Sequence, residues 1–314
     1  MHAVTVVDQR PEWRQHPDPR PGHGEVLVRV RAAGLNGADR IQLAGLYPAP
    51  AGSPADVLGL ELAGEGAATG PGVTRWHEGD RVMAVVGGGG QAELAVVHER
   101  HLLPVPEALP WAEAGGFPEV FTTAHDALFT QCRLALGERV CIHGAAGGVG
   151  IAGVQLAVAA GASVVATVRD PDRRADVTAL GATAVAPDEF VDHGPFDVVL
   201  ELVGAPNMAA NLRALAVGGR ISVIGIGAGA KAEVNLGALM SQRGMIHGST
   251  LRARSLEDKA TAARLVEAHV LPLLAAGTLR VPVAATYAMA DAGAALDHFA
   301  AGGKFGKIVL LAPG

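Results

Sequence analysis

The pattern of hydrophobic and polar positions changes near residue 138, and this change predicts two domains. Before it, the apolar runs are short. The segment EVLVRVRAAG alternates with period two, which places its valines on one face of a β-strand. Similar short runs follow in GDRVMAVV, QAELAVV and HLLPVP, each bounded by glycine or proline. Residues 1–110 are therefore expected to form a β domain, and the segment WAEAGGFPEVFTTAHDALF after it is expected to be helical.

From about residue 138 the pattern alternates between strands and helices. ERVCIH, SVVATV, FDVVLEL and GRISVIGIG have the character of buried strands, and the segments between them have the character of helices. This alternation is typical of a parallel, doubly wound sheet, so an α/β domain is expected over 111–251. The remaining 252–314 begins with one helix over 256–276. This tail is too short for a domain of its own and is expected to complete the β domain.

The run from Val140 to Val168 contains no Asp, Glu, Lys or Arg, and its length would allow it to span a bilayer. Glycines and His143 interrupt it where turns are expected, so a buried strand, a loop, a helix and a second strand are favoured. The net charge of -6 argues against a nucleic-acid partner or an anionic membrane surface. The first residues lack a signal-peptide pattern, and a cytoplasmic protein is expected.

The stretch IHGAAGGVGIAG, with a strand before it and a helix after it, predicts a dinucleotide site. Gly147 would let the backbone approach a pyrophosphate, and Gly150 would let the helix pack closely on the strand. The first position of the G-x-G-x-x-G pattern is Ala145, whose methyl group is tolerable at a tight turn. The alternative is a strand–helix turn whose glycines serve packing alone.

The residues after the next strand indicate which dinucleotide binds. An NAD site usually carries an acidic residue at the strand end, where this chain has Val168. Arg169 and Arg173 follow, and cations suit a 2′-phosphate, so NADPH is expected rather than NADH. Asp170 complicates this prediction, because it could tether an arginine or contact a ribose. The segment RDPDRR could also be an ordinary solvated helix start.

Five segments occur in a characteristic order: AAGLNGADRIQLAGLYPAP, VLGLELAGEG, HGAAGGVG, the Gly181–Ala182 pair and GGKFGKIVLL. In these the chain resembles the medium-chain dehydrogenase/reductase superfamily, and within it the zinc-independent quinone oxidoreductase-like group. The resemblance implies a GroES-like domain, a Rossmann domain and a cleft between them. It also implies a homodimer in which the edge strand GMIHGS pairs across a two-fold axis.

Departures from the zinc alcohol dehydrogenases lead us to expect no metal site. Asn36 stands where those enzymes have a cysteine ligand, and Leu60 stands where they have a histidine ligand. Ala38 replaces the hydroxyl of their proton relay. Asp39 and Glu61 remain, but two carboxylates alone make a poor zinc site. Cys132 and Cys141, the two cysteines of the chain, cannot form the four-cysteine structural lobe.

The resemblance implies Tyr47, at the mouth of the cleft, and Asn36, beside the nicotinamide, as catalytic residues. The residues expected to bind the cofactor are Asn36, Thr123, Gly147, Gly148, Val149, Thr167, Arg169, Arg173, Val203, Gly225, Ser249, Thr250 and Lys304. Three of these assignments have structural alternatives. Asn36 could close a turn, Tyr47 could be a packed ring, and Thr123, expected at the head of the helix beneath the cofactor, could be a plain helix-start residue.

Without zinc, the charge that develops on a substrate must be stabilised by hydrogen bonds. Reduction of a small hydrophobic quinone or α,β-unsaturated carbonyl by NADPH fits this best, with Tyr47 and the Asn36 amide holding the carbonyl. Two alternatives stay open: a dedicated enoyl reductase of a biosynthetic pathway, and an NADPH-binding sensor or structural protein without catalysis. The sequence does not identify the acceptor.

Overall fold

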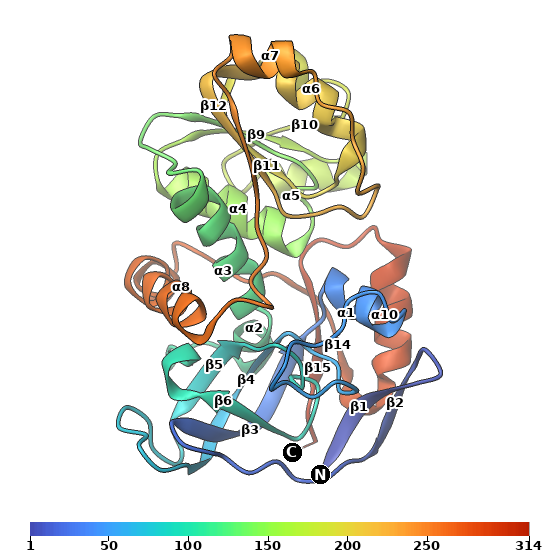
Figure 1. Cartoon of the computed structure of the whole chain (residues 1–314), viewed down its shortest axis with the longest axis vertical. Helices are drawn as coiled ribbons and strands as arrows, with labels where there is room; N and C mark the ends of the chain where they lie inside the picture. The colour runs from blue at the N-terminus through green and yellow to red at the C-terminus, as the bar shows by residue number, and fades with distance from the viewer. Residues whose placement is uncertain (314) are drawn as a thin grey trace. The chain divides into compact units, whose positions relative to one another are not determined.

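The computed structural model describes residues 1–313, and these fall into two compact units (Figure 1). The first unit contains Met1–Thr122, Leu251–Gly302 and the chain from Lys307 onward. The second contains Thr123–Thr250 and the short segment Gly303–Gly306. The C-terminal tail thus joins the N-terminal β domain.

The first unit is built on a seven-stranded sheet with the order β14-β15-β3-β4-β5-β7, and β6 pairs with β3. The valines of β3 are buried, as the period-two pattern predicts. The strands of this unit are β1 (His2–Val7), β2 (Arg10–Gln15), β3 (Glu25–Gly34), β4 (Glu61–Thr69), β5 (Arg81–Val85), β6 (Leu94–His98), β7 (Leu103–Pro104), β14 (Val283–Ala288) and β15 (Lys307–Leu311). Its helices are α1 (Gly37–Leu43), α2 (Trp111–Gly115), α8 (Leu256–His269), α9 (Leu271–Ala275) and α10 (Ala292–Ala301).

The helical segment after residue 110 differs from expectation in two ways. Residues 111–122 were expected in the second domain, yet α2 packs on β3 in the first unit, so closely that a Cβ at Gly115 would lie 2.6 Å from the Ala32 Cβ. Helix α3 (Pro118–His125) begins at Pro118, a residue favoured in the first helical turn, so Thr123 lies inside the helix and not at its head. A π-helix, Asp126–Gln131, follows directly.

The expected helix over 256–276 is two helices. Helix α8 ends at His269, and α9 begins at Leu271 with Pro272 in its first turn. Proline lacks the N–H that a continuous helix would need at this position, which accounts for the break. Short 3-10 turns cover Glu99–His101, Pro171–Arg173, Phe190–His193, Ala205–Asn207 and Met289–Asp291.

The second unit is a six-stranded sheet with the order β10-β9-β8-β11-β12-β13, and all its pairs are parallel. This confirms the doubly wound α/β prediction. Figure 1 shows helices α4 to α6 beside these strands. The elements are β8 (Arg139–Ile142), β9 (Ser163–Thr167), β10 (Thr183–Val185), β11 (Phe196–Glu201), β12 (Leu215–Val223), β13 (Met245–Gly248), α4 (Gly148–Ala159), α5 (Arg174–Thr178), α6 (Met208–Arg213) and α7 (Leu236–Ser241). The strand order reverses at β8, between β9 and β11, which is where sheets of this kind bind nucleotides.

Within residues 1–313, no helix combines the length and the hydrophobicity needed to cross a membrane. The apolar run at 140–168 forms β8, the glycine loop, α4 and β9, as expected.

Candidate cofactor and acceptor sites

The glycine loop joins β8 to α4 at the reversal point of the sheet. The positive φ of its turn, +63°, belongs to Gly144, one residue before Ala145. Ala145 is buried, and its N–H donates to the Thr167 carbonyl at 3.1 Å. The loop therefore tolerates an alanine here because the preceding glycine takes the conformation that alanine would resist.

Two glycines of the loop are present for different physical reasons. A Cβ at Gly150 would lie 2.6 Å from the Ala145 Cα, so close packing inside the chain requires that glycine. Gly147 has φ -82°, and a Cβ there would meet only the Gly144 carbonyl oxygen at 3.4 Å. Within residues 1–313, no neighbouring part of the chain requires glycine at position 147, so the missing side chain leaves space for a ligand. Because the N–H groups of the first turn of α4 start here, at Gly148 and Val149, the loop fits a pyrophosphate.

Other residues expected to bind the cofactor follow the carboxyl ends of neighbouring strands. Val203 comes after β11, and its N–H donates to the Glu201 carboxylate at 2.7 Å. Gly225 follows β12, and a Cβ there would lie 2.2 Å from the Leu202 carbonyl oxygen. Ser249 follows β13, and its hydroxyl donates to Asp126 at 3.1 Å. Thr250 is next in sequence, and Lys304 lies in the segment grouped with this unit. Their contacts with a cofactor stay predictions.

A buried hydrogen-bonded chain lies beneath these strand ends and was not predicted from sequence. Asn211 donates to the Glu201 carboxylate at 2.7 Å, so its carbonyl oxygen faces His143, whose Nε2 lies 2.8 Å away. His143 Nε2 therefore donates, and Nδ1 accepts from the Thr167 hydroxyl at 3.0 Å. Burial lowers the pKa of His143 below its usual value and favours this neutral form. These hydrogen bonds hold Thr167 with its hydroxyl proton directed at His143.

The arginines after β9 differ in their partners. Arg173 Nη1 lies 3.1 Å from Asp176, and its Nε lies 4.0 Å from Asp170. Arg174 donates to the Val168 carbonyl at 3.3 Å, and Arg169 is exposed. A 2′-phosphate at Arg173 would thus share that guanidinium with two carboxylates.

In the first unit, Asn36 belongs to a buried cluster with Glu61 and Lys307. The Asn36 amide donates to Glu61 at 2.9 Å and to the Gly34 carbonyl at 3.3 Å. Its oxygen accepts from Lys307 Nζ at 2.8 Å, and the same ammonium lies 2.6 Å from Glu61. Both amide donors of Asn36 are therefore used inside the chain. The expected hydrogen bond from this amide to an acceptor carbonyl stays a prediction, and it requires one of these bonds to be given up.

Asp39 lies beside this cluster and accepts the N–H groups of Asn36 at 2.7 Å and Gly59 at 3.2 Å. Burial raises the pKa of the Asp39 carboxyl to about 6, against the effects of those two N–H donors and of Lys307. A buried carboxyl with so high a pKa binds a proton in the folded state under conditions where the unfolded chain has released it.

This gives a prediction for stability against pH. Because the folded pKa exceeds the unfolded one, the stabilisation from protonated Asp39 is present below pH 3.8 and is lost as pH rises through about 6. Between pH 5 and 7 wild type should lose about 1 kcal/mol relative to Asp39→Ala. The measurement is urea unfolding followed by tryptophan fluorescence, since Trp13, Trp76 and Trp111 all lie in the first unit. Parallel pH profiles for the two proteins would contradict it.

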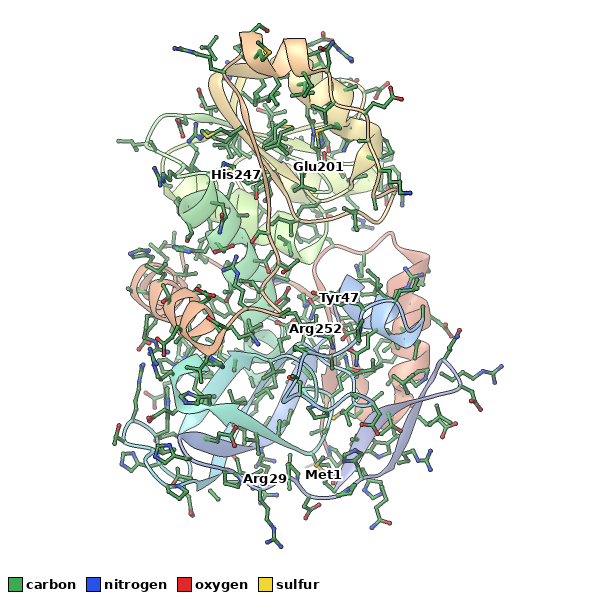
Figure 2. All side chains as sticks on the ribbon, in the orientation of Figure 1. Met1, Arg29, Tyr47, Glu201, His247 and Arg252 are labelled. Carbon is green, nitrogen blue, oxygen red and sulfur yellow. The ribbon has the colours of Figure 1, made fainter. Side chains whose placement is uncertain are left out.

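Tyr47 follows α1 and is half-buried, with Arg252 stacked on its ring (Figure 2). Its hydroxyl has no hydrogen-bond partner within residues 1–313, so the phenol proton is available to a ligand. Burial raises the pKa of Tyr47 above its usual value. At neutral pH this hydroxyl is a hydrogen-bond donor and not a base.

The side chains at the positions compared with zinc ligands are poorly suited to bind a metal. The part of the chain from residue 1 to 313 contains no group of three or more His, Cys, Asp or Glu side chains placed to hold a metal ion. Asn36 is hydrogen-bonded, Leu60 has no ligand atom, and the Glu61 carboxylate is paired with an ammonium. Both cysteine thiols are buried.

Two family models match the chain. The model described as alcohol dehydrogenase GroES-like domain matches residues 22–107, and the one described as zinc-binding dehydrogenase matches residues 148–268. A quinone oxidoreductase of Pseudomonas aeruginosa is 32% identical over 96% of this chain and 95% of its own. The polyketide synthase GfsB of Streptomyces halstedii is 33% identical over 92% of this chain, which spans only 5% of that protein.

Solved structures agree with these matches. The quinone oxidoreductase of Pseudomonas syringae pv. tomato is 30% identical, with a TM-score of 0.86 over 99% of this chain and 98% of that one. A mycobacterial protein complexed with NADPH is 26% identical, with a TM-score of 0.87 over 99% and 100% of the two chains. The protein belongs to the medium-chain dehydrogenase/reductase superfamily and, within it, is quinone oxidoreductase-like. It is an oxidoreductase of a family that binds a nicotinamide cofactor.

Proposed function

We propose that this protein reduces a quinone or an α,β-unsaturated carbonyl with NADPH and without zinc. The observation that carries the proposal is the cluster of Asn36, Glu61 and Lys307, where an amide, a carboxylate and an ammonium satisfy one another. Such a cluster offers no ligand set to a Lewis-acid metal. The substrate carbonyl must therefore be polarised by hydrogen bonds, which suffices when the product anion is delocalised.

Gly147, the first turn of α4 and Tyr47 each have a physical task in this reaction. NADPH, when bound, would supply a hydride, that is, one proton with two electrons, to the β-carbon of an enone or to a quinone. Gly147 and the first turn of α4 hold the phosphates. The Tyr47 hydroxyl donates to the carbonyl oxygen as negative charge develops there. A proton from water completes the product, so one acceptor, one NADPH and one proton give the reduced acceptor and NADP+.

A second candidate, the enoyl reductase of a biosynthetic pathway, is favoured by a specific observation. The relatives include polyketide synthases, among them the spectinabilin synthase protein NorB of Streptomyces orinoci, 35% identical over 92% of this chain. The chain spans 13% of that protein. The chemistry is the same hydride addition, but the acceptor would be an enoyl thioester.

The experiment that tests both candidates is an acceptor panel. NADPH oxidation is followed at steady state with quinones, short enones and enoyl thioesters. Turnover with quinones or free enones supports the first candidate, and turnover confined to enoyl thioesters supports the second. NADPH binding without turnover of any acceptor contradicts both and indicates a binding protein.

NADPH is expected to bind more tightly than NADH, because Arg169 and Arg173 follow a strand that ends without an acid. A charge-assisted contact is worth about 1.5–3 kcal/mol, or about one to two decades in affinity. Arg173→Ala should remove most of this preference and leave NADH binding nearly unchanged. Arg174→Ala is the matched control, because it removes an equal charge from the adjacent position. Fluorescence titration of the three proteins with both cofactors gives one NADPH-to-NADH affinity ratio for each protein, and equal affinities in wild type contradict the assignment.

A homodimer is expected through β13, the edge strand of the second unit. This edge is apolar: Met245 and Ile246 on β13 and Leu236 and Met240 on α7 are exposed, Met240 by 76%. An uncovered apolar edge favours pairing with a second copy. Light scattering should give twice the chain mass of 31.9 kDa at micromolar concentration. Ile246→Lys should shift the protein toward the monomer, and a wild-type monomer would reject the prediction.

A further inference from the structure

Arg252 is a buried cation in the first unit, at the point where the chain returns to it. Its guanidinium donates in three directions, each time to an uncharged oxygen. Nε bonds the Gly87 carbonyl at 2.7 Å, Nη1 bonds the Tyr47 carbonyl at 2.7 Å, and Nη2 bonds the Gln42 side chain at 2.5 Å. One side chain thus ties the end of α1, the loop after it and the start of a four-glycine run.

The same guanidinium covers the Tyr47 ring. Its central carbon lies 4.7 Å from the ring centroid, and Figure 2 shows the two residues together. Cation–π contact and the bond to the Tyr47 carbonyl act on one residue from two directions, so they fix both its backbone and its ring plane. The loop after Tyr47 also packs closely on the glycine run, because a Cβ at Gly87 would lie 2.2 Å from the Ser53 hydroxyl and 2.8 Å from Pro50.

The charge of Arg252 acts directly on the phenol. Burial raises the pKa of Tyr47, the positive charge of Arg252 lowers it, and the negative charge of Glu119 raises it. The negative charges of Asp39 and Glu119 act on the guanidinium, and the positive charge of Arg252 lowers the pKa of Lys259. None of the hydrogen-bond acceptors of Arg252 neutralises its charge, so its field reaches the Tyr47 hydroxyl.

We propose that Arg252 is a positioning residue for Tyr47, which holds the phenol in place and keeps a fixed positive charge beside it as the substrate oxygen becomes negative. The inference rests on the proposed function, because it assumes that Tyr47 donates to an acceptor carbonyl. The placement matters for that chemistry, because a cation that is already desolvated and fixed stabilises developing charge without reorganisation during the reaction.

The test exploits the fact that the chain contains two tyrosines, Tyr47 and Tyr287. In a Tyr287→Phe background, the phenolate absorbance of Tyr47 can be titrated alone. Arg252→Gln in this background should raise the pKa of Tyr47. It should also lower kcat for an enone about tenfold, less than the loss of a direct oxyanion donor, with KM nearly unchanged. Arg252→Lys keeps the charge but not the three-way geometry, so it should restore much of the titration and only part of kcat.

Arg81→Gln is the matched control. Arg81 also stacks on an aromatic ring, Trp111 at 4.4 Å, and donates to the backbone carbonyls of residues 106, 107 and 109 in the same unit. Its loss should lower thermal stability and leave the Tyr47 titration and kcat unchanged. An unchanged Tyr47 pKa in Arg252→Gln, or an equal loss of kcat in Arg81→Gln, overturns the proposal.

The test also gives a result if Arg252→Gln does not fold or if the protein reduces no acceptor. If Arg252→Gln does not fold, Arg252→Lys decides alone, since a wild-type kcat in that variant overturns the positioning role. The phenol titration needs no turnover, so it separates this inference from the proposed function. A raised Tyr47 pKa in a protein that reduces no acceptor supports the coupling of Arg252 to Tyr47 and counts against the proposed reaction only.

Discussion

Replacing Lys307 by methionine is expected to lower the free energy of unfolding of the first unit by about 3–5 kcal/mol. The ammonium is buried and meets three acceptors: Glu61, the Asn36 side chain and the Leu35 carbonyl at 2.7 Å. Removing it leaves the Glu61 carboxylate fully buried without its counter-charge, and uncompensated buried charge is what makes such substitutions costly. Urea unfolding followed by tryptophan fluorescence reports on this unit, because all three tryptophans lie in it.

Two controls separate burial from charge in this experiment. Arg31→Met breaks an ion pair with Glu65, 2.8 Å apart and partly exposed, on the neighbouring strands β3 and β4. Its cost should stay below about 1 kcal/mol. The double variant Lys307→Met/Glu61→Gln removes both charges and should recover part of the lost stability. A similar loss of unfolding free energy in Lys307→Met and Arg31→Met would contradict the prediction that the buried ion pair contributes more than the exposed one.

Local sequence patterns predicted the elements whose signal lies within a single segment. The period-two valines of β3 and the strand–loop–helix around Gly147 follow from a few neighbouring residues, and both are where the pattern placed them. The prediction of one helix over 256–276 was wrong because the apolar periodicity continues across Pro272, which separates α8 from α9. Helix α2 belongs to the first unit, where Gly115 packs against Ala32. These two residues are far apart in the sequence, so no local pattern predicts their contact.

The supporting residues of the sites could not be predicted for the same reason. Lys307 meets partners more than 270 residues away, and Arg252 meets Tyr47 over 205 residues. The sequence signal was a charged residue in or directly beside an apolar run, as with Glu201 in FDVVLEL and Lys307 before IVLL. A charge in such a run must be paired when buried, so it indicates a partner without identifying it. Asn36 was expected to contact a ligand, and that contact stays a prediction; the internal partners of its amide, Glu61 and the Gly34 carbonyl, were not predicted.

Tyr47→Phe is expected to lower kcat for an enone about tenfold to a hundredfold. The phenol hydroxyl has no partner within residues 1–313, so the substitution removes no hydrogen bond from the fold and keeps the ring beneath Arg252. What it removes is the donor proposed to meet the enolate oxygen. Water could replace this donor in part, which places the effect below the largest oxyanion-hole losses. A quinone should be less affected, because its reduction gains aromatic stabilisation of its own.

Tyr287→Phe is a matched control with the opposite expectation. The Tyr287 hydroxyl lies 2.9 Å from His298 Nδ1, so its removal breaks a hydrogen bond of the fold and should lower the melting temperature without changing kcat. For Tyr47→Phe the melting temperature and NADPH affinity should hardly move while kcat falls. The measurements are kcat at saturating NADPH on one enone and one quinone, with thermal melts of both variants. If kcat stays at the wild-type value on both acceptors, Tyr47 is a packed ring, and the donor to the substrate oxygen must be sought elsewhere.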